Sequence, residues 1–129
     1  MNGYLIATVA GALGLGLTLP AALAETQAEI SEAAKAQVIE AIESYVERDS
    51  RVKEAFLLLD PRSGEPIRLS FDHVHEGVQA HEQGYVACVD FKDGAGRVYD
   101  VDIVVGKSAP MEIAKAFLHK AEGKAITAK

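Results

Sequence analysis

Three of the four histidines in this 129-residue chain fall within one short segment, and imidazole is the commonest metal-binding side chain. His73 and His75 are two residues apart, so on a strand both side chains point to one face, about 6.6 Å apart along the chain. His81 follows beyond Gly77, where the chain can fold back and supply a third ligand. The spacing therefore predicts a metal site formed by His73, His75 and His81.

The predicted ligands are imidazole nitrogens, with a carboxylate of Glu76 or Glu82 as the alternative to His81. Imidazole and carboxylate ligands together suit Zn²⁺, Cu²⁺ or Ni²⁺. Three protein ligands leave a fourth position open on the ion, and that arrangement permits hydrolytic chemistry. We therefore expect zinc, copper or nickel if the histidines bind an ion, and no cofactor otherwise.

A structural role is the alternative for the same histidines. His73 and His75 continue the alternation of Ile67, Leu69 and Phe71, so this pattern places them on the core side at the end of a strand. Backbone groups would then satisfy their ring nitrogens. A further alternative is that these histidines are solvated surface side chains near a hairpin and have no function.

Carboxylates and a thiol form a second group of candidates. Asp100 and Asp102 share one face of a predicted strand, with Asp90 across from them on the preceding strand. Paired carboxylates perform acid–base catalysis when burial or a neighbour raises one pKa, and otherwise form a solvated sheet face. Cys88, the only cysteine, is expected to be an inert thiol that points with Val86 and Asp90, with no disulfide partner in the chain.

The first 24 residues carry no charged side chain and are rich in Leu, Ala and Gly. Ala22 and Ala24 form the small-x-small pattern that signal peptidase accepts, so we predict a cleaved signal peptide, residues 1–24, and one domain, residues 25–129. The protein is then periplasmic or secreted. A retained membrane anchor is the alternative, because the apolar stretch approaches the roughly 20 residues that a spanning helix needs.

The charge balance narrows the class of partner. Asp and Glu outnumber Lys and Arg by 19 to 13, which gives a formal net charge of −6. The chain therefore lacks the positive charge with which proteins neutralise phosphates, and we predict no nucleic-acid partner. A hydrophobic fraction of 49% is ordinary for a globular domain with a single core.

Residues 26–48 are predicted to form one amphipathic helix. Thr26 to Glu29 has the form of a capping box, and apolar residues follow at three- and four-residue steps from Ile30 to Tyr45. Glutamates occupy much of the opposite side, as expected for a helix with one face in water.

From Val52 onward the pattern changes to short β-type runs separated by turn residues. Four antiparallel strands are predicted, at 52–60, 66–75, 84–91 and 97–105, and the last two are joined at residues 92–96, where Asp93-Gly94 is a hairpin signal. The segment 110–121 is compatible with a helix that begins near Ser108 and Pro110 or with a fifth strand. We predict the helix, because its polar residues fall on one helical face.

A long helix followed by an antiparallel meander predicts an α+β domain in which the helix packs on one sheet face. Over residues 26–105 this layout resembles the cystatin-like and NTF2-like folds, where a helix packs on a curved sheet. The resemblance is architectural and no family motif accompanies it. Such folds host carriers, inhibitors and enzymes alike, so the resemblance implies little about activity.

Two functions follow as hypotheses. The first is a small exported, non-enzymatic domain that binds a protein partner or a small ligand through an apolar sheet face, because the sequence contains no phosphate-binding glycine loop, nucleophile elbow or nucleotide fingerprint. The second is an envelope metal-binding protein that uses the histidine segment. A pocket-bearing hydrolase or lyase that uses Asp100 or Asp102, and a homodimer formed through an open sheet edge, are further alternatives.

Overall fold

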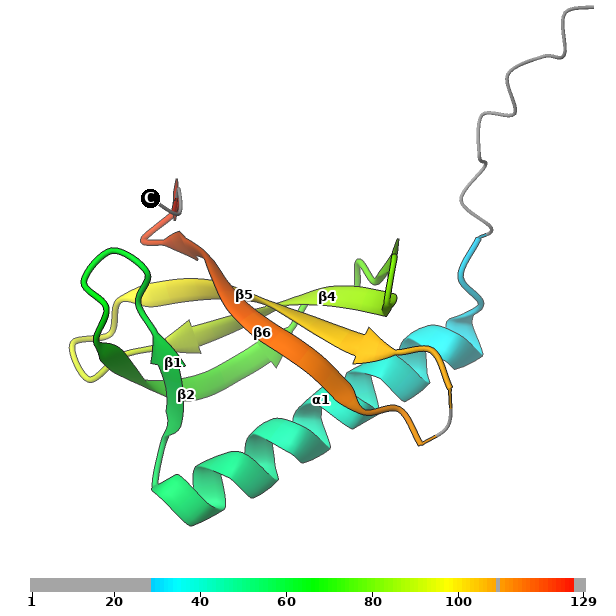
Figure 1. Ribbon diagram of the computed structural model, residues 1–129, viewed down its shortest axis with the longest axis horizontal. Coiled ribbons are helices and arrows are strands. Elements are labelled where there is room, and N and C mark those ends of the chain that lie inside the picture. Colours follow the sequence, from blue (N-terminus) through cyan, green and yellow to red (C-terminus); the bar gives the residue numbers. More distant parts are fainter. Residues whose placement is uncertain (1–28, 109, 127–129) are drawn as a thin grey trace, which may run out of the picture.

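The computed structural model describes residues 29–108 and 110–126, and the structural statements that follow concern these residues. They form one helix and a curled antiparallel sheet, which confirms the predicted α+β class (Figure 1). The sheet contains seven strands where four were predicted. The elements are α1 (Glu32–Lys53), β1 (Phe56–Leu59), β2 (Pro66–Val74), β3 (Gln79–His81), β4 (Gly84–Lys92), β5 (Val98–Gly106), β6 (Ile113–Ala121) and β7 (Lys124–Ala125).

The helix begins later and ends later than predicted. Ser31 is its N-cap, and the Ser31 hydroxyl accepts a hydrogen bond of 3.1 Å from the Ala34 backbone N–H. The predicted cap at Thr26 and the predicted signal segment 1–24 lie outside the described residues. α1 continues to Lys53, where Glu54 ends it with a left-handed backbone (φ 62°). No helix in the described ranges is long and apolar enough to cross a membrane.

The strands are ordered β1-β2-β4-β5-β6-β7, and the short β3 also pairs with β4. Every pairing is antiparallel, with β4 and β5 in continuous register over nine residues at the centre. β1 also contacts β6 although the two are not neighbours in the sheet, so the sheet curls. Figure 1 shows α1 running along one side of this curled sheet.

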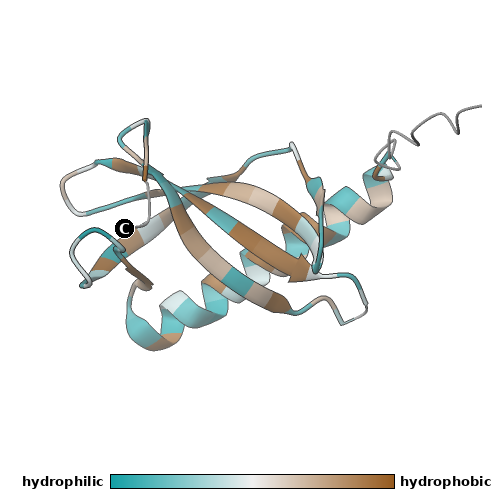
Figure 2. Ribbon diagram, turned by 45° about the horizontal axis from the view of Figure 1, so that its top comes forward, coloured by the Kyte–Doolittle hydropathy of each residue, from teal (hydrophilic) through white to brown (hydrophobic). Residues whose placement is uncertain are grey.

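The core lies between α1 and the sheet. Val38, Ile42 and Val46, spaced four residues apart, are the buried residues of the helix. Each strand contributes alternate side chains, and in Figure 2 the hydrophobic colour is concentrated on the central strands while teal covers much of the helix. Phe56 and Phe91 stack at the centre of the core, with ring centroids 4.7 Å apart. The buried residues of the sheet include Leu58, Leu69, Ala87, Val89, Val101, Ile103, Val105, Leu118 and Ala121.

The predicted C-terminal helix is wrong, and the alternative of a further strand is confirmed. Residues Ile113–Ala121 form β6, which pairs with β5 along most of its length. The free edge of β5 offers backbone partners to this whole segment, and that pairing outweighs the local helical periodicity. β3 and β7 were missed because segments of three and two residues carry no readable alternation.

Candidate functional site

A β-bulge in β2 decides where the histidines point. Phe71 pairs with the buried Phe91, but the next pair joins His73 to Asp90, so Asp72 is an extra residue in this strand. The extra residue inverts the alternation, and His73 therefore lies on the face opposite to Phe91. The interpretation of these histidines as core-closing residues is wrong, because both imidazoles are exposed.

We call the sheet face directed away from α1 the outer face. On β4 it carries Cys88 and Asp90, which alternate with the buried Ala87, Val89 and Phe91. The paired strand β5 adds two further carboxylates, because Asp102 lies opposite Cys88 and Asp100 lies opposite Asp90. The predicted direction of Cys88, with Asp90, is therefore confirmed.

The two histidines of β2 converge on a single carboxylate of β4. His75 Nε2 lies 2.8 Å from Asp90 Oδ1, and His73 Nε2 lies 3.6 Å from Asp90 Oδ2. The two imidazole rings stack with their centroids 5.1 Å apart. The other nitrogen of His73, Nδ1, lies 2.8 Å from Asp72 Oδ2, so the bulge residue orients the first imidazole. One ligand atom from each of His73, His75 and Asp90 lies within 4.8 Å of the others.

The structure brings His73 and His75 together and places Asp90 beside them, whereas His81 occupies another part of the surface. His81 belongs to β3, and its Nδ1 accepts a hydrogen bond of 3.0 Å from the Gln83 backbone N–H. Among the described residues, none of the metal-ligating groups includes His81, Glu76 or Glu82. Asp90 was recognised in the sequence as a neighbour of Asp100, but its position across from His73 depends on the bulge.

His119 is a site residue that sequence reasoning missed. Its Nδ1 lies 3.3 Å from Asp102 Oδ2, on the wall of an outer-face cavity of about 300 Å³. The register of β5 with β6 skips His119, which is the extra residue of a second bulge. No sequence signal pointed to it, because the segment was predicted to be helical. The polar residues of the cavity wall are His75, Gln79, Cys88, Asp100, Asp102, His119 and Lys120.

The environment of Cys88 suppresses its ionisation. Burial raises the pKa of the Cys88 thiol to about 11, and the nearby carboxylates of Asp100, Asp102 and Asp90 raise it in the same direction. Cys88 Sγ and one carboxylate oxygen from each of Asp90 and Asp100 also lie within 4.8 Å of one another. Because the proton is harder to remove from this thiol than from an ordinary cysteine, the pair of imidazoles with Asp90 is the better ligand set.

We expect Cys88 to react slowly with alkylating agents. A pKa of about 11 in place of 9.0 lowers the thiolate fraction at pH 8 by about 100-fold, and the thiolate is the nucleophile. The measurement is the rate of iodoacetamide modification, followed by mass spectrometry, on native and urea-unfolded chains. Asp100→Asn should accelerate the native reaction. A native rate equal to the unfolded rate would contradict the expectation.

Comparisons with known proteins were made at three levels. No family model, no curated protein and no solved structure matches this chain. The resemblance to cystatin-like and NTF2-like folds stays a prediction.

Proposed function

We propose that the protein binds a divalent transition-metal ion, Zn²⁺, Cu²⁺ or Ni²⁺, through His73, His75 and Asp90. One observation carries the proposal: Asp72 holds Nδ1 of His73 while Nε2 of both histidines converges on Asp90. A ligating imidazole in a metal site commonly gives its second nitrogen to a carboxylate, which fixes the ring orientation. Asp72 is the carboxylate that contacts the second nitrogen of His73.

The distances fit a small coordination sphere. Ligand atoms bound tetrahedrally at 2.0–2.1 Å from an ion lie about 3.3 Å from one another. The two nitrogen–oxygen separations, 2.8 Å and 3.6 Å, lie on either side of that value. These two distances end at different oxygens of Asp90, so side-chain rotation is needed to give the three ligands one common centre; one ligand atom from each residue already lies within 4.8 Å of the others. A fourth position stays open to solvent, because both imidazoles are exposed.

Charge on the outer face favours a cation. Asp90 lies opposite Asp100 on β5, and Asp102 is two residues further along that strand. These carboxylates lower the energy of a bound divalent ion through its positive charge. Lys120, paired with Asp100 across β5 and β6, is the positive residue of this cavity wall.

The competing hypothesis, binding of a protein partner or small ligand through the sheet, receives less support. It expected an apolar and accessible sheet face, whereas the centre of the outer face carries Cys88 and three aspartates. The apolar face of the central strands β4 and β5 is covered by α1, whereas β2 leaves Phe71 partly exposed beside the helix. Export, signal cleavage and a homodimer stay predictions beside the proposed metal function.

Metal binding is tested by titrating the full-length chain, carrying a histidine-free tag, with ZnCl₂, CuCl₂ and NiCl₂, and with MgCl₂ as control. We expect 1:1 binding by calorimetry and a stabilisation of about 2.7 kcal/mol at 100 times the dissociation constant. Binding should weaken in acid, because protons compete with metals for imidazole nitrogens.

Variants identify the third ligand. Asp90→Asn and the double variant His73→Ala/His75→Ala should lose binding, whereas His81→Ala should bind as the wild type does. His73 and His75 are exposed and His81 is only partly buried, so the histidine variants should fold in the absence of metal. The proposal is overturned if none of the three transition metals binds, or if Asp90→Asn binds normally while His81→Ala does not.

A further inference from the structure

A groove on the helix side of the sheet is separate from the histidine cluster. It has a volume of about 590 Å³ and runs between the C-terminal half of α1 and β2. Its apolar lining consists of Val46, Ala55, Leu69 and Phe71. The bulge at Asp72 separates the two sites, because Leu69 and Phe71 before it face the groove and the core while His73 after it faces outward.

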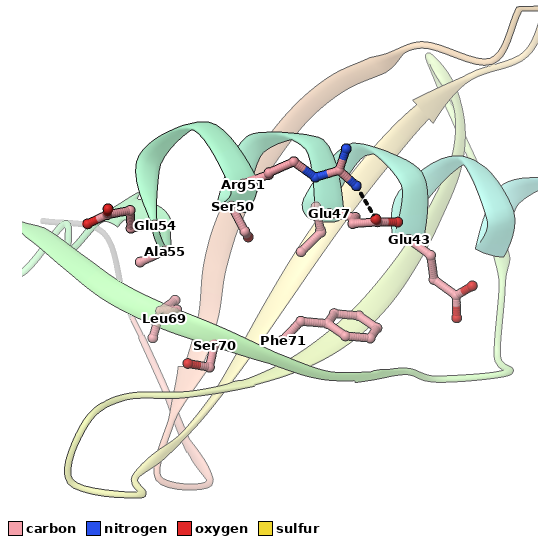
Figure 3. A pocket seen from close by; sticks show the side chains of 10 residues that line it. Glu43, Glu47, Ser50, Arg51, Glu54, Ala55, Leu69, Ser70 and Phe71 are labelled. Atoms are coloured by element: carbon pink, nitrogen blue, oxygen red, sulfur yellow. Dashed lines mark hydrogen bonds and ion pairs between the residues drawn. The ribbon is translucent and has the colours of Figure 1, made fainter.

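Phe71 is the most exposed part of the apolar floor. Its side chain keeps 39% of its surface in solvent, while its ring makes an edge contact with Phe91 at a centroid distance of 6.0 Å. Figure 3 shows the Phe71 ring lying along the groove below α1, with Leu69 further along β2. The ring therefore offers apolar area and a π-face to a ligand.

Carboxylates lie at both ends of the groove. Figure 3 shows Glu43 at one end of the helical wall and Glu54 at the other, with Glu47 and Arg51 between them. Glu47 and Arg51 form an ion pair, so the middle of the wall is neutral overall. Within the described part of the chain, Glu43 and Glu54 form no ion pair. The ten helical residue steps from Glu43 to Lys53 correspond to about 15 Å, and Glu54 follows directly, so the two ends of the groove are separated by about that length.

Glu54 occupies a backbone conformation that favours glycine. Its φ of 62° lies in the left-handed region, where helices usually end with glycine because other residues are strained there. The chain therefore holds a carboxylate at this end of the groove at a cost in stability.

We propose that this groove binds an elongated organic dication, a molecule that is apolar in the middle and carries an ammonium group at each end. The apolar middle lies on the partly exposed Phe71 ring, beside the buried Leu69 and Val46, and the neutral Glu47–Arg51 pair flanks it. One ammonium group pairs with Glu43 and the other with Glu54. A volume of about 590 Å³ is within the usual range for small-molecule sites.

The test uses four probes with the same ten-carbon chain: 1,10-diaminodecane, decylamine, 1,10-decanediol and decanedioic acid. With the full-length protein we expect saturable 1:1 binding of the diamine by calorimetry. Decylamine should bind severalfold more weakly, and the diol and the diacid at least tenfold more weakly. The affinity for the diamine should fall as NaCl is raised, because salt screens charge pairs at an exposed site.

Matched variants assign the binding to this groove. Glu43→Gln and Glu54→Gln should each weaken diamine binding severalfold, and Phe71→Ala should weaken it as well. Glu40→Gln is the control for loss of one negative charge, because Glu40 lies on the same helix but lines a different groove. His73→Ala/His75→Ala should bind the diamine normally, so this test is independent of the metal proposal.

Three results would overturn the dication proposal. The first is the absence of saturable diamine binding, and the second is equal binding of the diamine and the diacid. The third is an equal loss of affinity in Glu40→Gln and Glu43→Gln, which would show that the diamine binds to the acidic surface in general.

Discussion

Replacement of Gly84 by alanine is expected to cost at least about 3 kcal/mol of folding free energy. Gly84 begins β4 with φ 149°, a conformation that residues with a Cβ rarely adopt. An alanine Cβ there would overlap the Val105 carbonyl oxygen and lie 2.8 Å from the Lys107 backbone nitrogen. Since both neighbours are backbone atoms, no side-chain rotation relieves the clash, and β4 must separate from β5.

Gly94→Ala is the matched control for this substitution. Gly94 has no atom within 4 Å of an added Cβ and is not among the glycines with positive φ. Its replacement should change stability by less than about 1 kcal/mol, because alanine fits such a position without strain. Thermal unfolding distinguishes the two: about 3 kcal/mol corresponds to a fall in Tm of at least about 12 °C in a domain of this size. Equal melting temperatures for the two variants would contradict the predicted clash.

The central strands could be predicted from the sequence because local chemistry determines them. The turn between β4 and β5 is one example, since the Asp93 carboxylate accepts hydrogen bonds from the Ala95 and Arg97 backbone N–H groups. The carboxylate also accepts a hydrogen bond from the Tyr99 hydroxyl. A short polar side chain that organises its own turn leaves a clear signal in the sequence.

The composition of the site could be predicted only in part. His73 and His75 share a face because they are two residues apart, and that inference needs no partner strand. Their third companion, Asp90, depends on the register with β4, and the extra residue Asp72 sets that register. A bulge changes the side-chain pattern by one residue, and the sequence of β2 alone contains no mark of it.

The helix predicted for the C-terminal segment was wrong for a different reason. The polar residues of the segment 110–121 are compatible with one helical face, and this local pattern predicts a helix. The competing interaction is the open edge of β5, which becomes apparent only once the sheet is assembled. The position of His119 beside Asp102 could therefore not be predicted, because it depends on the formation of β6.

Replacement of Phe91 by alanine is expected to destabilise the protein by about 3–5 kcal/mol. Phe91 is fully buried. Its ring stacks on Phe56 at a centroid distance of 4.7 Å and makes an edge contact with the Phe71 ring. Its removal leaves a cavity at the centre of the aromatic cluster, and the loss adds the transfer free energy of the ring to the cost of that cavity. Urea unfolding of the metal-free protein measures the effect.

Asp90→Asn is the natural partner for Phe91→Ala, because the two residues are adjacent on β4 but point to opposite faces. In the metal-free protein we expect Asp90→Asn to cost less than about 1 kcal/mol, since its imidazole partners are exposed. With a transition metal present, the wild type and Phe91→Ala should both gain stability, and Asp90→Asn should not. If Phe91→Ala folds and yet gains none, the core and the metal site are energetically coupled, and the expected independence of the two faces of β4 is wrong.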